Sequence, residues 1–163
     1  MPKTIKVSLF DGNSISSAIK ELNRYRRWVQ RKENELRLRL LEAGATVASV
    51  KFSSAVYDGA NDVSVRVDDS GHTATIYAEG TAVAFIEFGS GSAYGYGHPE
   101  ASRFGVGPGT YPDGKGHWNS PNGWWYAHGK HSYGNAPAMA MYDAREEIVN
   151  RYTQIAREVF GGD

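Results

Sequence analysis

The side chains best suited to chemistry in this chain are one glutamate and a set of histidines, all close to glycine-rich sequence. Glu87 stands two residues before Gly89, where a buried carboxylate could act as a general acid or base. His128, His131 and His117 could together offer three imidazoles to a metal ion. Both patterns have a simpler, structural interpretation. A carboxylate can accept hydrogen bonds from the following turn or pair with an arginine, and glycine-rich sequence does not hold metal ligands rigidly.

We therefore expect no catalytic residue, no metal and no cofactor. The chain has no cysteine, which excludes disulfides and thiolate chemistry. Its glycine-rich runs, such as residues 105–109, do not join a strand directly to the start of a helix, as a phosphate-binding loop does. These observations favour a protein that binds other proteins over an enzyme.

The segment at about residues 90–135 gives the strongest indication of binding. Its part from Gly91 to Asn135 holds eleven of the 19 glycines and has neither a helical nor a strand period, which predicts a long loop. Large aromatic side chains in such a polar segment are typical of a surface where another chain docks. We expect a subunit interface that includes Trp118, Trp124, Trp125, Tyr126 and Tyr111. The tryptophans could instead form a platform for sugars, so the alternative is a carbohydrate-binding or cell-wall-degrading module.

Bulk composition narrows the function further. The chain has 163 residues with 18 basic and 18 acidic side chains, which suits one domain over residues 1–163 with no net charge to attract nucleic acid or membrane. The N-terminal sequence lacks the apolar run of a signal peptide, and no segment approaches the length of a membrane span. We expect a soluble protein, made in the cytoplasm.

The first large element is a helix. Ile15, Leu22, Val29 and Leu36 lie seven residues apart and predict a long amphipathic helix over about residues 14–43 or longer.

The opposite face of this helix is basic, with Arg24, Arg27, Arg31 and Arg39. A solvated face, or one paired with an acidic neighbour, is the usual explanation of such a row. We expect the basic face to meet acidic surface on adjacent subunits, or DNA without sequence preference.

Three strand-like runs follow, after a short β-prone segment at residues 4–10 near the N-terminus. Residues 63–68 and 73–78 alternate apolar with polar or small side chains around a tight turn. Residues 82–88 form a third run that is apolar on both faces for most of its length, as in a central strand. We predict a β-meander of three or more antiparallel strands over about residues 61–89.

The end of the third run is expected to anchor the loop. There Glu87, Phe88 and Gly89 form a turn that glycine permits. Asn135-Ala136-Pro137 then opens a C-terminal helix over about residues 137–160. The predicted fold class is α+β.

Several blocks of the sequence resemble one family. Residues 84–91, AFIEFGSG, are similar to the F-[IV]-E-F-G-[TS]-G signature of the neck or tail-completion (head–tail joining) proteins of long-tailed bacteriophages. Residues 48–59, His98-Pro99-Glu100, residues 123–126 and residues 134–142 resemble further blocks of that family in the same order. The resemblance spans about residues 14–160.

This resemblance implies a structural virion protein of the neck or tail end that has no enzyme activity. Its copies would form a homo-oligomeric ring, expected to be hexameric, that joins or completes the tail at the head connector. The implied partners are the connector or head-completion protein and the tail-tube or tail-terminator protein, with DNA held only non-specifically in the channel and no membrane. The inserted loop varies within such families, so its role transfers least.

Overall fold

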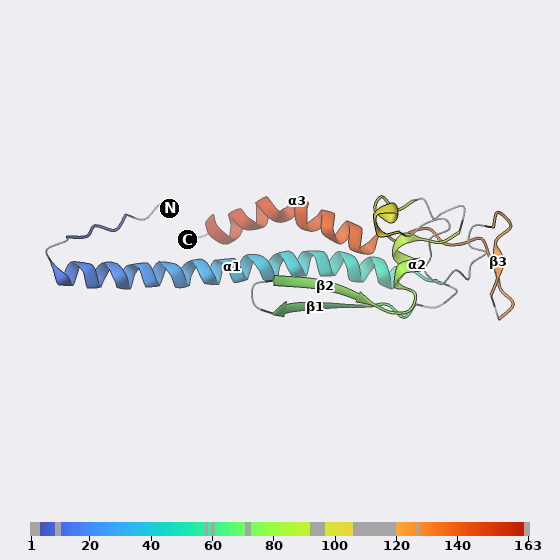
Figure 1. The fold of residues 1–163 in the computed structure, drawn as a ribbon, viewed down its shortest axis with the longest axis horizontal. Helices are drawn as coiled ribbons and strands as arrows, with labels where there is room; N and C mark the ends of the chain where they lie inside the picture. The colour runs from blue at the N-terminus through green and yellow to red at the C-terminus, as the bar shows by residue number, and fades with distance from the viewer. Residues whose placement is uncertain are drawn as a thin grey trace.

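Two antiparallel helices are the largest elements of the structure. The computed structural model describes residues 4–8, 11–57, 59, 61–70, 73–91, 97–105, 120–126 and 128–161. Helix α1 runs over Gly12–Ser54, and helix α3, Ala140–Gly161, lies beside its second half. The first part of α1 therefore extends beyond the end of α3 (Figure 1).

The length of α1 follows from its caps and from one glycine that does not break it. Asp11 caps its first turn by accepting a hydrogen bond from the Asn13 backbone N–H. Gly44 stays helical and buried because Ile148 of α3 and Ile76 pack against it; a β-carbon there would lie 2.6 Å from Ile148 Cδ1. The predicted helix is confirmed, and it is longer than 14–43.

A β-hairpin covers one side of α1. Strands β1, Ser64–Ser70, and β2, Thr73–Glu79, pair antiparallel with Val65 opposite Ala78 and Val67 opposite Ile76. Arg37 of α1 forms an ion pair with Asp69 of β1, and the Asp69 carboxylate raises the pKa of the Arg37 guanidinium by accepting its hydrogen bond. The hairpin is thereby fixed to the middle of α1.

The prediction of a third strand is wrong. Residues Val83–Phe88 form a short helix, α2. The region 61–89 therefore contains a two-stranded hairpin and this helix in place of the predicted three-stranded meander. Ala82 and Ile86, four residues apart, are its buried hydrophobic positions, as on one side of a helix, and Glu87 is buried next to Ile86. A six-residue apolar run does not by itself distinguish the two periods.

The loop region contains small elements of its own. A 3₁₀ turn, η1, covers Ala101–Phe104, and strands β3, Trp124–Trp125, and β4, His131–Ser132, form a second two-stranded antiparallel sheet. Figure 1 shows this small sheet at the end of the molecule opposite the start of α1. Within residues 4–8, which we expected to be β-prone, the structure has no strand.

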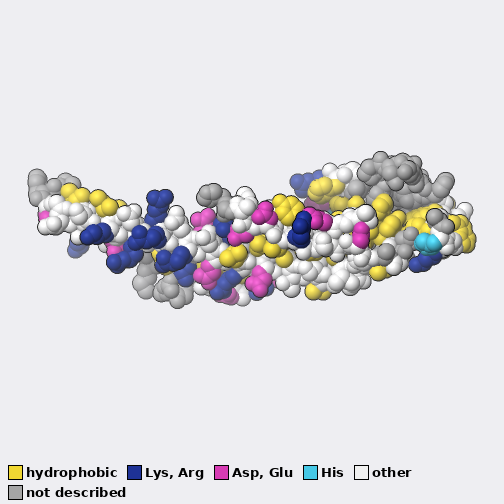
Figure 2. All heavy atoms as spheres, turned by 90° about the horizontal axis from the view of Figure 1, so that it is seen from below, with side chains coloured by type: hydrophobic (Ala, Val, Ile, Leu, Met, Phe, Trp, Pro, Cys, Tyr) yellow, Lys and Arg dark blue, Asp and Glu magenta, His cyan; other side chains and the backbone are white. Residues whose placement is uncertain are grey.

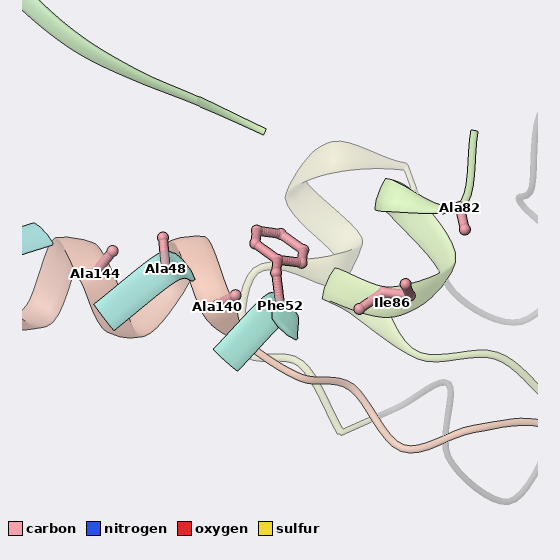
Figure 3. Close-up of a cluster of buried hydrophobic side chains, with 6 residues drawn as sticks. All are labelled: Ala48, Phe52, Ala82, Ile86, Ala140 and Ala144. Carbon is pink, nitrogen blue, oxygen red and sulfur yellow. The ribbon is translucent and has the colours of Figure 1, made fainter. Parts of the chain in front are cut away.

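The core lies where α1, α2 and α3 meet (Figure 3). Phe52 and Ile86 are its large members, and small side chains complete it: Ala48, Ala82, Ala140 and Ala144. Alanines allow the helices to approach closely, so one phenylalanine ring fills the centre. This core sits at one end of α1.

The predicted α+β class and C-terminal helix are confirmed, the latter over 140–161 instead of 137–160. Within the described residues, no helix combines the length and apolar character required to span a bilayer.

The position of Phe52 leads to a test of the core. Phe52→Ala should lower the free energy of unfolding by about 3–5 kcal/mol, because it removes the largest fully buried side chain and leaves a cavity among alanines that cannot fill it. Val50→Ala, on the same helix with Val50 62% exposed, should change it by no more than about 0.5 kcal/mol. Urea unfolding of both variants provides the comparison, and equal losses would contradict this description of the core.

Candidate interaction surfaces

The Glu87 carboxylate joins α2 to the start of α3. Its Oε2 accepts a hydrogen bond from the Met141 backbone N–H at 2.9 Å, and its Oε1 accepts one from the Tyr142 N–H at 3.0 Å. These are among the first N–H groups of α3, which have no acceptor inside the helix. Met139, the residue before α3, has φ +52° and a side chain that cannot cap. Glu87 therefore caps α3 from another element.

His98 completes this network. Its Nε2 lies 3.2 Å from Glu87 Oε1, and its Nδ1 accepts a hydrogen bond from the Glu100 backbone N–H at 3.0 Å. Because Nδ1 is an acceptor, the proton of the neutral ring sits on Nε2 and is donated to Glu87. Both ring nitrogens are thus occupied within the protein. A pocket of about 380 Å³ adjoins the pair and is lined by both Glu87 and His98.

We expected Glu87 to hold the turn that follows it, and the structure shows a different arrangement. The turn is held by Asn135, whose backbone exchanges two hydrogen bonds with Ser90 at 2.9 and 3.1 Å. The Asn135 side-chain amide also donates to the Phe85 carbonyl at 2.9 Å. The two ends of the 90–135 segment are therefore tied together at its base.

Gly89 and Gly91 make this close approach possible. Both have positive φ, +76° and +83°, and a β-carbon on Gly89 would lie 2.8 Å from the Asn135 carbonyl oxygen. A β-carbon on Gly91 would collide with the Tyr133 carbonyl oxygen. Phe88 packs nearby, with its ring 4.5 Å from the His98 ring and 5.7 Å from Phe104. The Glu-Phe-Gly-Ser-Gly sequence is thus explained by capping, ring packing and backbone contact.

The aromatic residues divide between packing and exposure. Tyr126 is half-buried against Tyr57 and Trp124, with ring centroids 6.0 and 6.1 Å away. Trp125 is 71% exposed and its ring lies 4.8 Å from His131. Tyr133 is also exposed, and its ring centroid lies 4.7 Å from that of His131.

We call the exposed Trp125 and Tyr133, together with the half-buried His131, the aromatic tip. Trp118 and Tyr111, also predicted at the interface, lie outside the described residues. So does His117, and among the residues that the structure describes, no three His, Asp or Glu side chains come together as a metal site.

The basic face is divided by the structure. Arg39 is used within the chain, where it pairs with Glu35 at 2.8 Å and with Glu158 of α3 at 3.4 Å. Arg24 and Arg27 lie on the projecting part of α1, Arg31 follows just after it, and all three are exposed. Arg24 has an ion pair with Glu21, at 3.3 Å on the helix surface.

Sequence reasoning missed His98 and Asn135. His98 was recorded only as part of His98-Pro99-Glu100, and Asn135 only as the residue that opens the last helix. A signal for both was present: Glu87 required donors if buried, and an exposed segment of this length requires a closure at its base.

Comparisons with known proteins add no relative: no protein-family model matches this chain, and no curated protein or solved structure matches it significantly.

The role of Glu87 can be tested by two substitutions. Glu87→Ala should lower the free energy of unfolding by about 3 kcal/mol or more, because it leaves two helix N–H groups and the His98 N–H buried without an acceptor. Glu87→Gln keeps one acceptor oxygen but places an amide N–H₂ against a donor, so it should cost roughly half as much. Thermal unfolding distinguishes the two, and an equal loss for both would argue against the cap.

The start of α2 has a cap that responds to pH. Asp62 accepts hydrogen bonds from the Thr81 hydroxyl and from the backbone N–H groups of Thr81 and Ala82, and these lower the pKa of its carboxyl. Because the pKa is lower in the folded state, the contribution to stability is complete above about pH 4–5 and is lost as the pH falls below the usual aspartate value of about 3.9. The stability difference between wild type and Asp62→Asn should therefore shrink from pH 7 to pH 3.

Thr81→Ala serves as the control for this prediction, because it removes the hydroxyl donor and leaves the carboxylate in place. The combined variant should lose less stability than the sum of the two single variants, since the two groups share one interaction. A difference that stays constant over the whole pH range would show that the Asp62 charge does not contribute.

Proposed function

We propose that this chain is a structural subunit of the neck or tail end of a long-tailed bacteriophage. Its copies assemble as a hexameric ring that joins or completes the tail at the head connector. The chain is made in the host cytoplasm and ends in the virion. The implied partners are the connector or head-completion protein on one side and the tail-tube or tail-terminator protein on the other.

The observation that carries this proposal is an elongated chain with apolar side chains exposed at both ends. Its accessible surface is 10895 Å², whereas a globular monomer of 17.9 kDa has about 8,000 Å². Ile19 and Leu22 are exposed at one end and Trp125 and Tyr133 at the other. A chain that buries so little of itself is suited to an assembly, in which neighbours cover the remaining surface.

The roles of the motif residues support the same function. The sequence block that most resembles the family, residues 84–91, contains a helix-capping glutamate and two glycines at a backbone contact. Each of these residues has a structural role in the described contacts. The block fits a scaffold that presents a loop, as a ring subunit would present one to the next ring.

The exposed cations of α1 fit the expected contact with DNA. Lys20, Arg24, Arg27 and Arg31 lie at spacings of four, three and four residues and form a row on one side of the helix. Such a row contacts phosphates without reading bases, so any binding to DNA is weak and falls steeply with salt.

The aromatic tip gives the test of this function. A phage lacking this gene should regain head–tail joining when wild-type protein is supplied, and Trp125→Ala should lose at least tenfold in infectious yield while remaining folded, because the exposed ring makes the contact with the next component. Tyr77→Ala, an exposed aromatic on β2, is the control and should complement normally. Failure of the wild-type protein to restore joining would overturn the proposal.

The alternative, a carbohydrate-binding or cell-wall-degrading module, rests on the same exposed rings. Trp125 beside His131 and Tyr133 is an arrangement on which a sugar ring can stack. Quenching of tryptophan fluorescence by cell-wall sugars, lost in Trp125→Ala, would favour that alternative over a virion role.

A further inference from the structure

The projecting start of α1 is an arm with two different sides. We define the arm as Gly12–Arg27, which precedes Trp28, where the last turn of α3 makes contact through Phe160 at 6.1 Å. The arm is about 24 Å long at 1.5 Å per residue. Its basic row, described above, occupies one side. Ile15, Ile19 and Leu22 occupy another, and Ile19 and Leu22 are 54% and 55% exposed.

The apolar side of the arm continues onto α3. Tyr25 stacks on Trp28 at 5.6 Å, and Trp28 meets Phe160. From Phe160 the exposed apolar positions continue along one side of α3 to Tyr152 and Val149. An apolar strip therefore runs from the arm to the middle of α3. The N-terminal segment, residues 4–8, lies beside the start of the arm (Figure 1), where Ala18 is buried, but Ile19 and Leu22 stay exposed.

Charge is separated along the same axis. Residues 1–32 carry eight basic and two acidic side chains, whereas residues 33–163 carry ten basic and sixteen acidic ones. A chain with no net charge is thus about +6 in its first fifth and −6 in the rest. Figure 2 shows basic side chains gathered over the arm and acidic ones over the middle of the molecule.

We propose that the arm of one copy docks on the middle of α3 of a neighbouring copy. Ile19 and Leu22 of the arm would cover Val149 and Tyr152. Arg26, four residues after Leu22 and exposed on the same side of the arm, would lie near Glu146, three residues before Val149 on the receiving α3. A second copy is the occupant that the charges favour, because the chain itself contains the opposite charge that its arm requires.

The contact joins two different surfaces, so it is a head-to-tail interface, and repeated head-to-tail contacts close into a ring when the rotation permits. The inference therefore rests on the proposed function for its biological setting. It can be tested without phage, on the purified chain.

The test is sedimentation of the purified protein with matched variants. Wild type should self-associate, and added salt should weaken the association, because opposite charges steer it. Leu22→Asp in the arm and Tyr152→Asp in α3 should each weaken association at least tenfold. Val50→Asp, which places the same charge on an equally exposed site of α1, should associate like wild type.

A mixture of the two defective variants decides the geometry. Each alone should sediment as a monomer, but a Leu22→Asp copy keeps an intact α3 and a Tyr152→Asp copy keeps an intact arm, so the mixture should form a heterodimer and stop there. A monomeric wild type, a Leu22→Asp chain that associates normally, or an association insensitive to Tyr152→Asp would each overturn the inference.

The two proposals fail separately. If wild type and Leu22→Asp restore head–tail joining equally well, the proposed arm contact is wrong and the proposed function stands. If the chain self-associates through the arm but does not restore head–tail joining, the arm contact stands and the proposed function is wrong.

Discussion

The structure depends on one buried carboxylate. Helix α3 begins at a residue that cannot cap it, and its first N–H groups point into a region that water does not reach freely. Glu87, more than fifty residues earlier, supplies the acceptor atoms, and His98 gives that carboxylate a third hydrogen bond. Without it, two elements would meet through unpaired donors, each costing about 1–3 kcal/mol. The position of α3 along α1, and with it the closure of the core around Phe52, therefore follows from a polar contact.

Side-chain hydrogen bonds to helix ends also hold the other places where two elements meet. Asp62 caps the start of α2, and the Asn61 side-chain amide donates to the Phe52 and Ala55 carbonyls at the end of α1. A core made largely of alanines contributes little burial per residue, at about 25 cal/mol per Å² of apolar surface, so polar contacts at the ends of helices have to fix their geometry. All of these caps gather at one end of α1. The arm, at the other end, is capped only by Asp11, a local contact that does not join it to another helix.

The sequence specified the long elements and left the short ones undecided. Heptad spacing from Ile15 to Leu36 identified α1, because a pattern repeated over many turns is hard to satisfy by chance, and the alternation of Val63, Val65 and Val67 identified the hairpin. Residues 82–88 were predicted as a central strand because they are apolar on both faces for most of their length. They are a helix because Asp62 caps them and because Ala82 and Ile86 must face the same core. The role of Glu87 as an acceptor was accessible from sequence, but its partners were not, since a contact across 54 residues leaves no local pattern.

The base of the loop explains how one fold can hold a segment of such unusual composition. Ser90 and Asn135 pair as if they were opposite residues of a sheet, so the chain between them leaves and returns at the same place. Changes in the length or sequence of the segment between Ser90 and Asn135 need not disturb α2, α3 or the core, because the hydrogen bonds between these two residues hold the ends of the segment in place. Loops anchored on rigid elements in this way are where binding specificity commonly resides. The aromatic tip is presented on such a loop, whereas the arm is an extension of the scaffold itself. The sequences of the two exposed ends are therefore constrained differently. The aromatic tip can change together with its partner protein, whereas the arm must fit a surface of another copy of the same chain.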